Sequence, residues 1–115
     1  MENKNFKRHC LTLDLYDDPE LIKGYEEWHK QVWPEIIDSI KASGIVDMQI
    51  YRASNRLFMI MEVNEHFDFE LKSISDTDNQ RVQEWESMMW QFQKPLSFAK
   101  PGEKWVIMNE IFSLK

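Results

Sequence analysis

The 115-residue sequence has one cysteine, three glycines and four prolines, and each scarcity excludes a class of protein. A single cysteine, Cys10, forms neither an intrachain disulfide nor a CxxC metal or redox motif. So few glycines, beside seven phenylalanines and five tryptophans, argue against disorder. No stretch approaches the ~18 apolar residues of a membrane span, and the start at residues 1–5 is polar. We therefore expect one soluble, cytoplasmic domain over residues 1–115.

An excess of basic residues is also missing, and several well-known site motifs are absent. The net charge of -6 argues against nucleic acid or an anionic membrane as a partner, because both bind basic surfaces. There is no glycine-rich phosphate loop, no HExxH or GxSxG motif, and no His/Cys/Asp cluster at metal-ligand spacing. Phosphate, nicotinamide and zinc chemistry are disfavoured, whereas a neutral small molecule is compatible with this charge.

What the sequence does contain is a regular alternation of strand and helix patterns. Asp18 and Pro19 are a typical helix start, and Gly44 is a typical C-terminal cap. We expect residues 66–75 to be a loop with at most a helical turn, and the third strand to be buried on both faces. The predicted strands cover Arg8–Leu15, Ile45–Tyr51, Arg56–Val63 and Lys104–Leu114, and the predicted helices run from Pro19 to Gly44 and from Asp78 through Phe92.

This order of elements predicts a fold class and an assembly. Strand, helix, strand, strand, helix, strand is typical of an α+β ferredoxin-like β-α-β-β-α-β sandwich, which has helices on one side of its sheet only. The other side of the sheet then needs a cover, and a second copy of so small a chain supplies one. We therefore expect a homodimer of the dimeric α/β barrel type.

The first predicted helix carries the most unusual residues. At about 3.6 residues per turn, Tyr25, His29 and Trp33 lie one above another on a single helix face. Pro34 lacks the amide that the helix needs there, so we expect a kink immediately after His29. An imidazole titrates near neutral pH, which makes His29 a candidate for proton transfer. The alternative is a core or interface histidine satisfied by a backbone carbonyl, with the aromatic residues serving as packing.

The side chains that remain as candidates, Tyr, His, Trp and carboxylates, are of the kinds that bind a sugar. Indole rings stack on the apolar C–H faces of a sugar, and phenol, imidazole and carboxylate groups hydrogen-bond its hydroxyls. A set of residues spread over nearly the whole chain carries a family resemblance: Tyr25, His29, Trp33-Pro34-Glu35, Gly44, Ile50-Tyr51, Leu57-Phe58, Glu62, Trp85, Met88 and Glu110-Ile111-Phe112. In their order and spacing, these residues resemble the L-rhamnose mutarotase family.

The resemblance implies a dimeric, ferredoxin-like α+β protein that interconverts the α and β anomers of a 6-deoxy sugar without a metal or organic cofactor. It implies that His29 is the proton-transfer residue, that Tyr25 lies beside the sugar and that Trp85 lines the pocket. The imidazole either shuttles both protons itself or acts with a phenol or carboxylate as the second group.

The chain differs from the rhamnose-specific members at positions that contact the sugar in that family. Met48 stands in place of a tyrosine, and Glu84-Trp85 in place of a Trp-Trp pair. The segments Arg8–Leu15, Asn55–Val63 and Lys100–Trp105 resemble the L-fucose mutarotase branch instead. We therefore predict L-fucose as the sugar, with L-rhamnose as the alternative. The predicted catalytic residues are Tyr25 and His29, and the predicted sugar-binding residues are Trp33, Met48, Glu84 and Trp85.

Two further functions remain open at this stage. The first is a non-catalytic sugar-binding or structural ferredoxin-like dimer in which His29 is satisfied in the core. The second is a monooxygenase of the related dimeric barrel type, either without a cofactor or with haem.

Overall fold

The computed structural model describes residues 6–115, and the polar start at residues 1–5 lies outside the described part. Within this range no helix is both long and apolar enough to cross a membrane. The elements in chain order are β1 (Lys7–Leu15), α1 (Pro19–Trp28), α2 (Pro34–Ala42), β2 (Ile45–Ala53), β3 (Arg56–Val63), α3 (Phe69–Thr77), α4 (Gln80–Met89), β4 (Gln93–Lys94) and β5 (Val106–Ile107).

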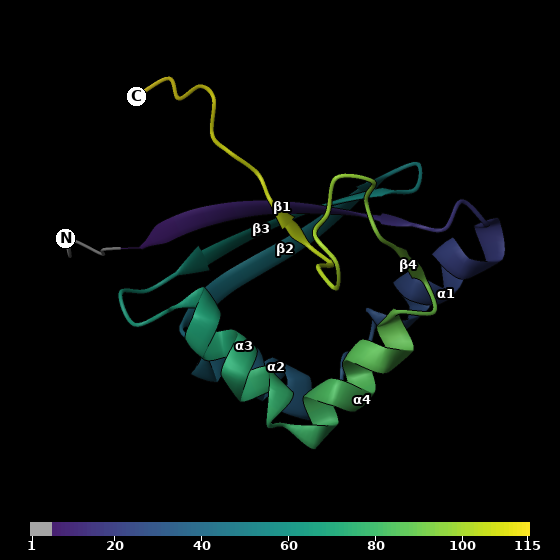
Figure 1. The fold of residues 1–115 in the computed structure, drawn as a ribbon, viewed down its shortest axis with the longest axis horizontal. Helices are drawn as coiled ribbons and strands as arrows, with labels where there is room; N and C mark the ends of the chain where they lie inside the picture. The colour runs from purple at the N-terminus through teal and green to yellow at the C-terminus, as the bar shows by residue number, and fades with distance from the viewer. Residues whose placement is uncertain (1–5) are drawn as a thin grey trace.

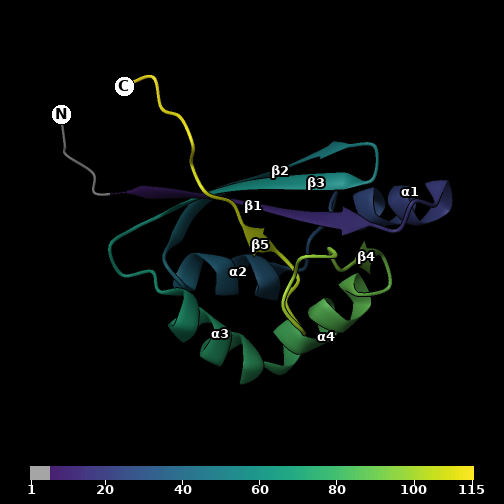
Figure 2. The same ribbon diagram turned by 45° about the horizontal axis from the view of Figure 1, so that its top comes forward.

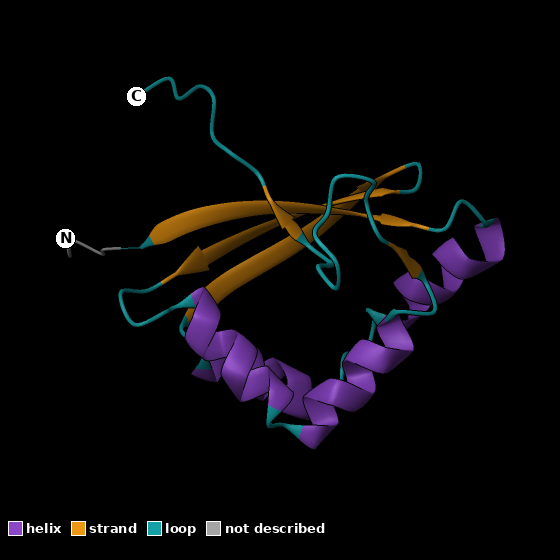
Figure 3. Ribbon diagram, viewed as in Figure 1, coloured by secondary structure: helices purple, strands orange, loops and turns teal. Residues whose placement is uncertain are grey.

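The strands form one antiparallel sheet, and the helices cover one side of it. The strand order is β2-β3-β1-β4, with β5 also pairing with β1. In residues 6–115 all the helices lie on the same side of the sheet, and the opposite side carries none (Figures 1 and 3). The predicted α+β ferredoxin-like fold is confirmed, with more helices than the two predicted.

Alternation along the strands places the core between the sheet and the helices. Leu13 and Leu15 of β1 and Leu57 of β3 are fully buried on this side. The prediction that β3 is buried on both faces is wrong. Phe58 and Ile60, which point to the other side, are only half-buried because no helix of residues 6–115 covers that side.

The first helix begins where the sequence predicts. The Asp18 carboxylate accepts hydrogen bonds from the backbone N–H groups of Glu20 and Leu21, at 2.9 and 3.3 Å, and Pro19 follows at the first helical position. Tyr25 is the buried residue of α1, and its side chain faces the core.

Pro34 divides the predicted first helix into two. α1 ends at Trp28, and α2 begins at Pro34, where a missing amide costs no helical hydrogen bond. Trp33 before it has φ −56° and ψ 136°, the extended conformation that a following proline favours. The expected kink is therefore a complete break, and His29 is the C-cap of α1. Trp33 lies outside the helix that carries Tyr25.

Residues 66–75, predicted to be a loop, contain most of α3. The Asp68 carboxylate caps this helix by accepting from the N–H groups of Glu70 and Leu71, at 2.8 and 3.0 Å. α3 has no buried residue, so its sequence lacks the apolar stripe from which helices are predicted. The capping residue Asp68 was the feature of the sequence that could have predicted the start of α3.

The last predicted strand, Lys104–Leu114, is reduced to the two residues of β5. The N–H of Met108 still donates to the carbonyl of Cys10 at 2.7 Å, and beyond this point the chain leaves the sheet (Figure 2). Ile111, Phe112 and Leu114 are 96%, 75% and 90% exposed. A strand needs a neighbour to hydrogen-bond, and residues 6–115 of this single chain offer none to the tail.

Candidate active site

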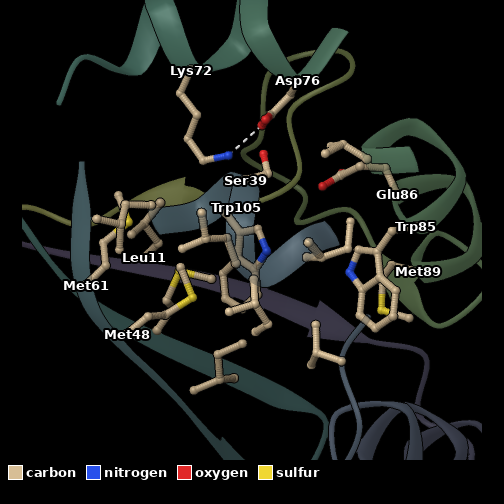
Figure 4. Close-up of a pocket in the computed structure, with 18 of the residues that line it drawn as sticks. Leu11, Ser39, Met48, Met61, Lys72, Asp76, Trp85, Glu86, Met89 and Trp105 are labelled. Atoms are coloured by element: carbon tan, nitrogen blue, oxygen red, sulfur yellow. Dashed lines mark hydrogen bonds and ion pairs between the residues drawn. The ribbon is translucent and has the colours of Figure 1, made fainter. Parts of the chain in front are cut away.

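A cavity of about 680 Å³ lies between the sheet and the helices. Its walls come from the three long strands and from all four helices of the described chain, with one further wall from the segment that precedes β5. In Figure 4, Met48, Met61 and Leu11 lie on one side of this space, Trp85 and Met89 on another, and the charged pair Lys72 and Asp76 along a third. A largely apolar cavity with a few polar groups is the usual form of a small-molecule site.

His29 lines this cavity at the point where α1 ends. Its Nδ1 lies 2.9 Å from the carbonyl oxygen of Tyr25. A carbonyl oxygen only accepts hydrogen bonds, so Nδ1 carries the proton and Nε2 keeps its lone pair. The Tyr25 ring lies against the imidazole, with centroids 4.3 Å apart. One backbone carbonyl thus fixes both the ring orientation and the tautomer, and leaves Nε2 as the basic atom.

Burial changes the proton affinity of both rings. It lowers the pKa of His29 below the usual 6.5, against a smaller opposing effect of the hydrogen bond to the Tyr25 carbonyl. Burial also raises the pKa of Tyr25 to about 12, and the charge of Glu86 adds to this while a hydrogen bond with Gln93 opposes it. At neutral pH the imidazole is therefore a free base, and the phenol stays protonated.

Trp85 belongs both to the cavity wall and to the hydrophobic core. The side chain is 6% exposed and lines the cavity. Its ring meets the His29 ring edge-on, with centroids 5.8 Å apart. Trp33 packs on Trp85 from outside the cavity, with centroids 5.1 Å apart, and the Arg81 guanidinium lies 3.8 Å from the centre of the Trp33 ring.

Of the predicted sugar-binding residues, Trp85 and Met48 line the cavity, whereas Trp33 and Glu84 do not. Glu84 is exposed, and its carboxylate accepts from Arg81 at 2.8 Å, one turn back along α4. We therefore leave Glu84 out of the candidate site and regard Trp33 as the support behind Trp85.

Several polar or aromatic residues that the sequence prediction missed also line the cavity, among them Lys72, Asp76 and the four described next. Glu86 and Lys104 form a pair in which Nζ donates to the carboxylate at 2.7 Å and to the Glu86 carbonyl at 3.0 Å. Trp105 follows directly after Lys104, and Gln93 begins β4. Lys104 and Trp105 belong to the Lys100–Trp105 segment, whose resemblance to the L-fucose branch is the sequence signal that could have identified these two residues.

The described residues 6–115 contain no group of three or more His, Cys, Asp or Glu side chains that could hold a metal ion. The polar side chains that line the cavity include the His29 imidazole, the Tyr25 phenol, the Gln93 carboxamide and the charged pairs Lys72–Asp76 and Glu86–Lys104.

Comparison with known proteins agrees with the sequence-based resemblance. The family model described as L-rhamnose mutarotase matches residues 8–114. The chain is 44% identical over 112 residues to an L-fucose mutarotase of Xanthomonas campestris pv. campestris, covering 96% of this chain and 90% of that protein. It is 37% identical over 51 residues to an L-rhamnose mutarotase of Paraburkholderia phytofirmans, covering 43% of this chain and 48% of that protein.

A solved structure supports the fold independently. The crystal structure of an L-rhamnose mutarotase from Formosa agariphila matches with a TM-score of 0.68, covering 95% of this chain and 99% of that chain. The two sequences are 20% identical, so this likeness concerns the fold alone.

Proposed function

The chain belongs to the L-rhamnose mutarotase family, and we propose that L-fucose is the sugar it prefers and that His29 performs the proton transfers. It is a sugar mutarotase, an isomerase that interconverts anomers. The observation that carries the catalytic role is the hydrogen bond from His29 Nδ1 to the Tyr25 carbonyl, which turns a neutral imidazole into the cavity as a base.

The cavity walls suit a 6-deoxyhexose. Such a sugar carries a methyl group and one face of C–H bonds, and both need apolar contacts. Met48 and Met61 provide adaptable apolar surface for a methyl group, and the Trp85 and Trp105 indoles provide flat surfaces for C–H bonds. Polar groups on the opposite side are left to bind hydroxyls.

The proposed reaction uses one imidazole as base and then as acid. His29 Nε2 takes the proton of the anomeric hydroxyl, the bond from C1 to the ring oxygen breaks, and the ring oxygen receives the proton from the imidazolium. After rotation about the C1–C2 bond of the open aldehyde, the same steps in reverse close the ring on its other face. The Tyr25 phenol, with a pKa of about 12, does not act as a base near neutral pH and serves as a neutral partner instead.

Two features support L-fucose over L-rhamnose. The first is the 44% identity to an L-fucose mutarotase over nearly the whole chain. The second is the position of Lys104 and Trp105 in the cavity wall, because this segment is where the sequence resembles the fucose branch. A cytoplasmic location, and the absence of nucleic acid or membrane partners, remain predictions from the sequence.

Saturation-transfer NMR on the anomeric protons tests the proposal directly. At catalytic protein concentration we expect faster exchange between the α and β anomers of L-fucose than of L-rhamnose. Preferential acceleration of L-rhamnose would overturn the choice of sugar. Absence of acceleration for both sugars would favour the non-catalytic binding protein and would return His29 to a packing role.

The rate should depend on pH through His29. Because burial lowers the imidazole pKa below 6.5, the free base is the main form at neutral pH. We expect kcat/KM for L-fucose exchange, corrected for spontaneous exchange, to be level at neutral pH and to fall with an acid limb whose midpoint lies below 6.5. A rate that instead rises as the pH falls through this range would mean that the imidazolium is the required form.

We further propose that the protein is a homodimer that buries the open sheet face, defined by Tyr51, Phe58 and Ile60. These apolar side chains lie on the side of the sheet that bears no helix in residues 6–115, and Tyr51 is 57% exposed. The apolar tail Ile111–Leu114 reaches away from its own sheet and is available to extend a partner's sheet.

Light scattering after size exclusion tests this assembly. We expect a mass of twice the 13.9 kDa chain, and a monomer for Ile60→Glu, which places a charge in the proposed interface. Leu71→Glu is the matched control, because Leu71 is 63% exposed on α3, on the side of the sheet away from that interface. A monomeric wild-type protein that is fully active would contradict the proposal.

A further inference from the structure

One buried polar atom in the cavity wall has no partner. Gln93 is 3% exposed, and its Oε1 is the one buried side-chain nitrogen or oxygen in residues 6–115 that makes no hydrogen bond. A buried acceptor without a partner is costly in a folded protein, so such atoms are rare and need an explanation. Because Gln93 also lines the cavity, a bound ligand can supply the missing donor.

Strand pairing within the sheet sets the position of Gln93. β4 consists of two residues, and within it Gln93 pairs with the fully buried Leu15 of β1. The adjoining bond from the Tyr16 N–H to the Phe92 carbonyl, 3.0 Å long, fixes the same segment. The Phe92 ring packs on the Tyr25 ring, with centroids 6.1 Å apart. The backbone of Gln93 is thus fixed beside Tyr25 in the cavity wall.

The two ends of the carboxamide have different surroundings. Burial raises the pKa of Tyr25 to about 12, and an interaction with the Gln93 side chain opposes this rise. Oε1 is the end that is left over. Oε1 therefore lacks a donor within residues 6–115, and a hydroxyl bound against this side chain can supply one.

We propose that Gln93 is a specificity-determining residue whose Oε1 accepts a hydrogen bond from one ring hydroxyl of the sugar. This inference rests on the proposed function, because it assigns a hydroxyl contact within the same cavity. L-fucose and L-rhamnose differ in the orientation of their hydroxyls, and an acceptor on a fixed stretch of backbone favours the sugar whose hydroxyl points toward it. A site built to bind a hydroxyl discriminates strongly against a sugar that cannot offer it.

The test replaces Gln93 with methionine, which has a similar shape and no hydrogen-bonding carboxamide. The probes are L-fucose and its 2-, 3- and 4-deoxy derivatives, and dissociation constants come from the fluorescence of the cavity tryptophans. For Gln93→Met we expect about 10-fold weaker binding of L-fucose. One deoxy sugar, lacking the relevant hydroxyl, should bind wild type and variant equally. The other two should retain the 10-fold difference.

Gln91→Met is the matched control, because Gln91 is exposed two residues earlier in the same segment. It should leave all four dissociation constants unchanged. We expect the melting temperature of Gln93→Met to stay within roughly 5 °C of wild type, because removing an unpaired acceptor offsets the lost contact to Tyr25. Equal binding of L-fucose by wild type and Gln93→Met would overturn the proposal, as would a 10-fold loss that is the same for all three deoxy sugars.

Binding and catalysis are read separately in this design. If wild type binds L-fucose without accelerating anomer exchange, the proposed reaction fails, while the dissociation constants still decide the role of Gln93. If exchange is fast and Gln93→Met binds as wild type does, the assignment of Gln93 fails alone. A wild-type protein that binds none of the four sugars overturns both.

Discussion

Replacing His29 with asparagine should slow the anomer exchange of L-fucose by about 10²–10⁴-fold, the usual contribution of a general acid or base. Asparagine places an amide N–H where Nδ1 of the imidazole lies, so it can still donate to the Tyr25 carbonyl. What it removes is Nε2, the atom that faces the sugar in the proposed reaction. Rates from saturation-transfer NMR and melting temperatures of both proteins measure the two effects separately.

His66→Asn is the matched control for this substitution. His66 is exposed in the turn before α3 and does not line the cavity, so its replacement should leave the exchange rate unchanged. If His29→Asn retains the wild-type rate, another group transfers the protons and the mechanism is wrong. If its melting temperature falls steeply with the rate, His29 is mainly a packing residue, as the alternative interpretation holds.

The fold was predictable wherever a local pattern coincided with a buried face. Alternation in β1 placed Leu11, Leu13 and Leu15 on the core side, and the Asp18-Pro19 pair marked the start of α1. Prediction failed where the pattern of apolar residues in the sequence did not correspond to a buried face. α3 buries no side chain, and the apolar residues of the C-terminal tail pair with no strand of residues 6–115.

The break between α1 and α2 shows a different limit. The apolar spacing continues across Pro34 as if through one helix, because side chains of both helices pack on the same core. Proline in a helix either kinks it or begins a new one, and the spacing does not distinguish the two. The Tyr25–His29 pair was predicted correctly as neighbours because both residues precede the break.

The rest of the candidate site depends on contacts between distant segments. Glu84 lies beside Trp85 in the sequence, yet it turns toward Arg81 on the surface of α4. Glu86 lines the cavity and is held by Lys104, which lies 18 residues further on. Gln93 reaches the cavity through its pairing with β1. No local spacing encodes these approaches, so the sequence alone does not reveal them.

Replacing Trp85 with alanine should have the largest effect on stability, about 3–5 kcal/mol, because it removes a large buried ring and leaves a cavity. The ring is 6% exposed and contacts the rings of Trp28, His29 and Trp33. A domain of this size has a total stability of roughly 5–15 kcal/mol, so a large part of it would be lost. Chemical denaturation with urea, monitored by circular dichroism, measures the change.

Trp28→Ala is the matched control for the loss of an indole. Trp28 is 40% exposed on the same aromatic cluster, so its replacement should lower the stability far less.

Two further variants separate support of the core from contact with the sugar. Trp85→Phe and Trp85→Leu both refill most of the space, but only phenylalanine keeps an aromatic face for stacking. We expect similar stabilities for the two, and tighter L-fucose binding by Trp85→Phe. Equal sugar affinities would show that Trp85 contributes packing alone, and a Trp85→Ala protein as stable as Trp28→Ala would contradict its place in the core.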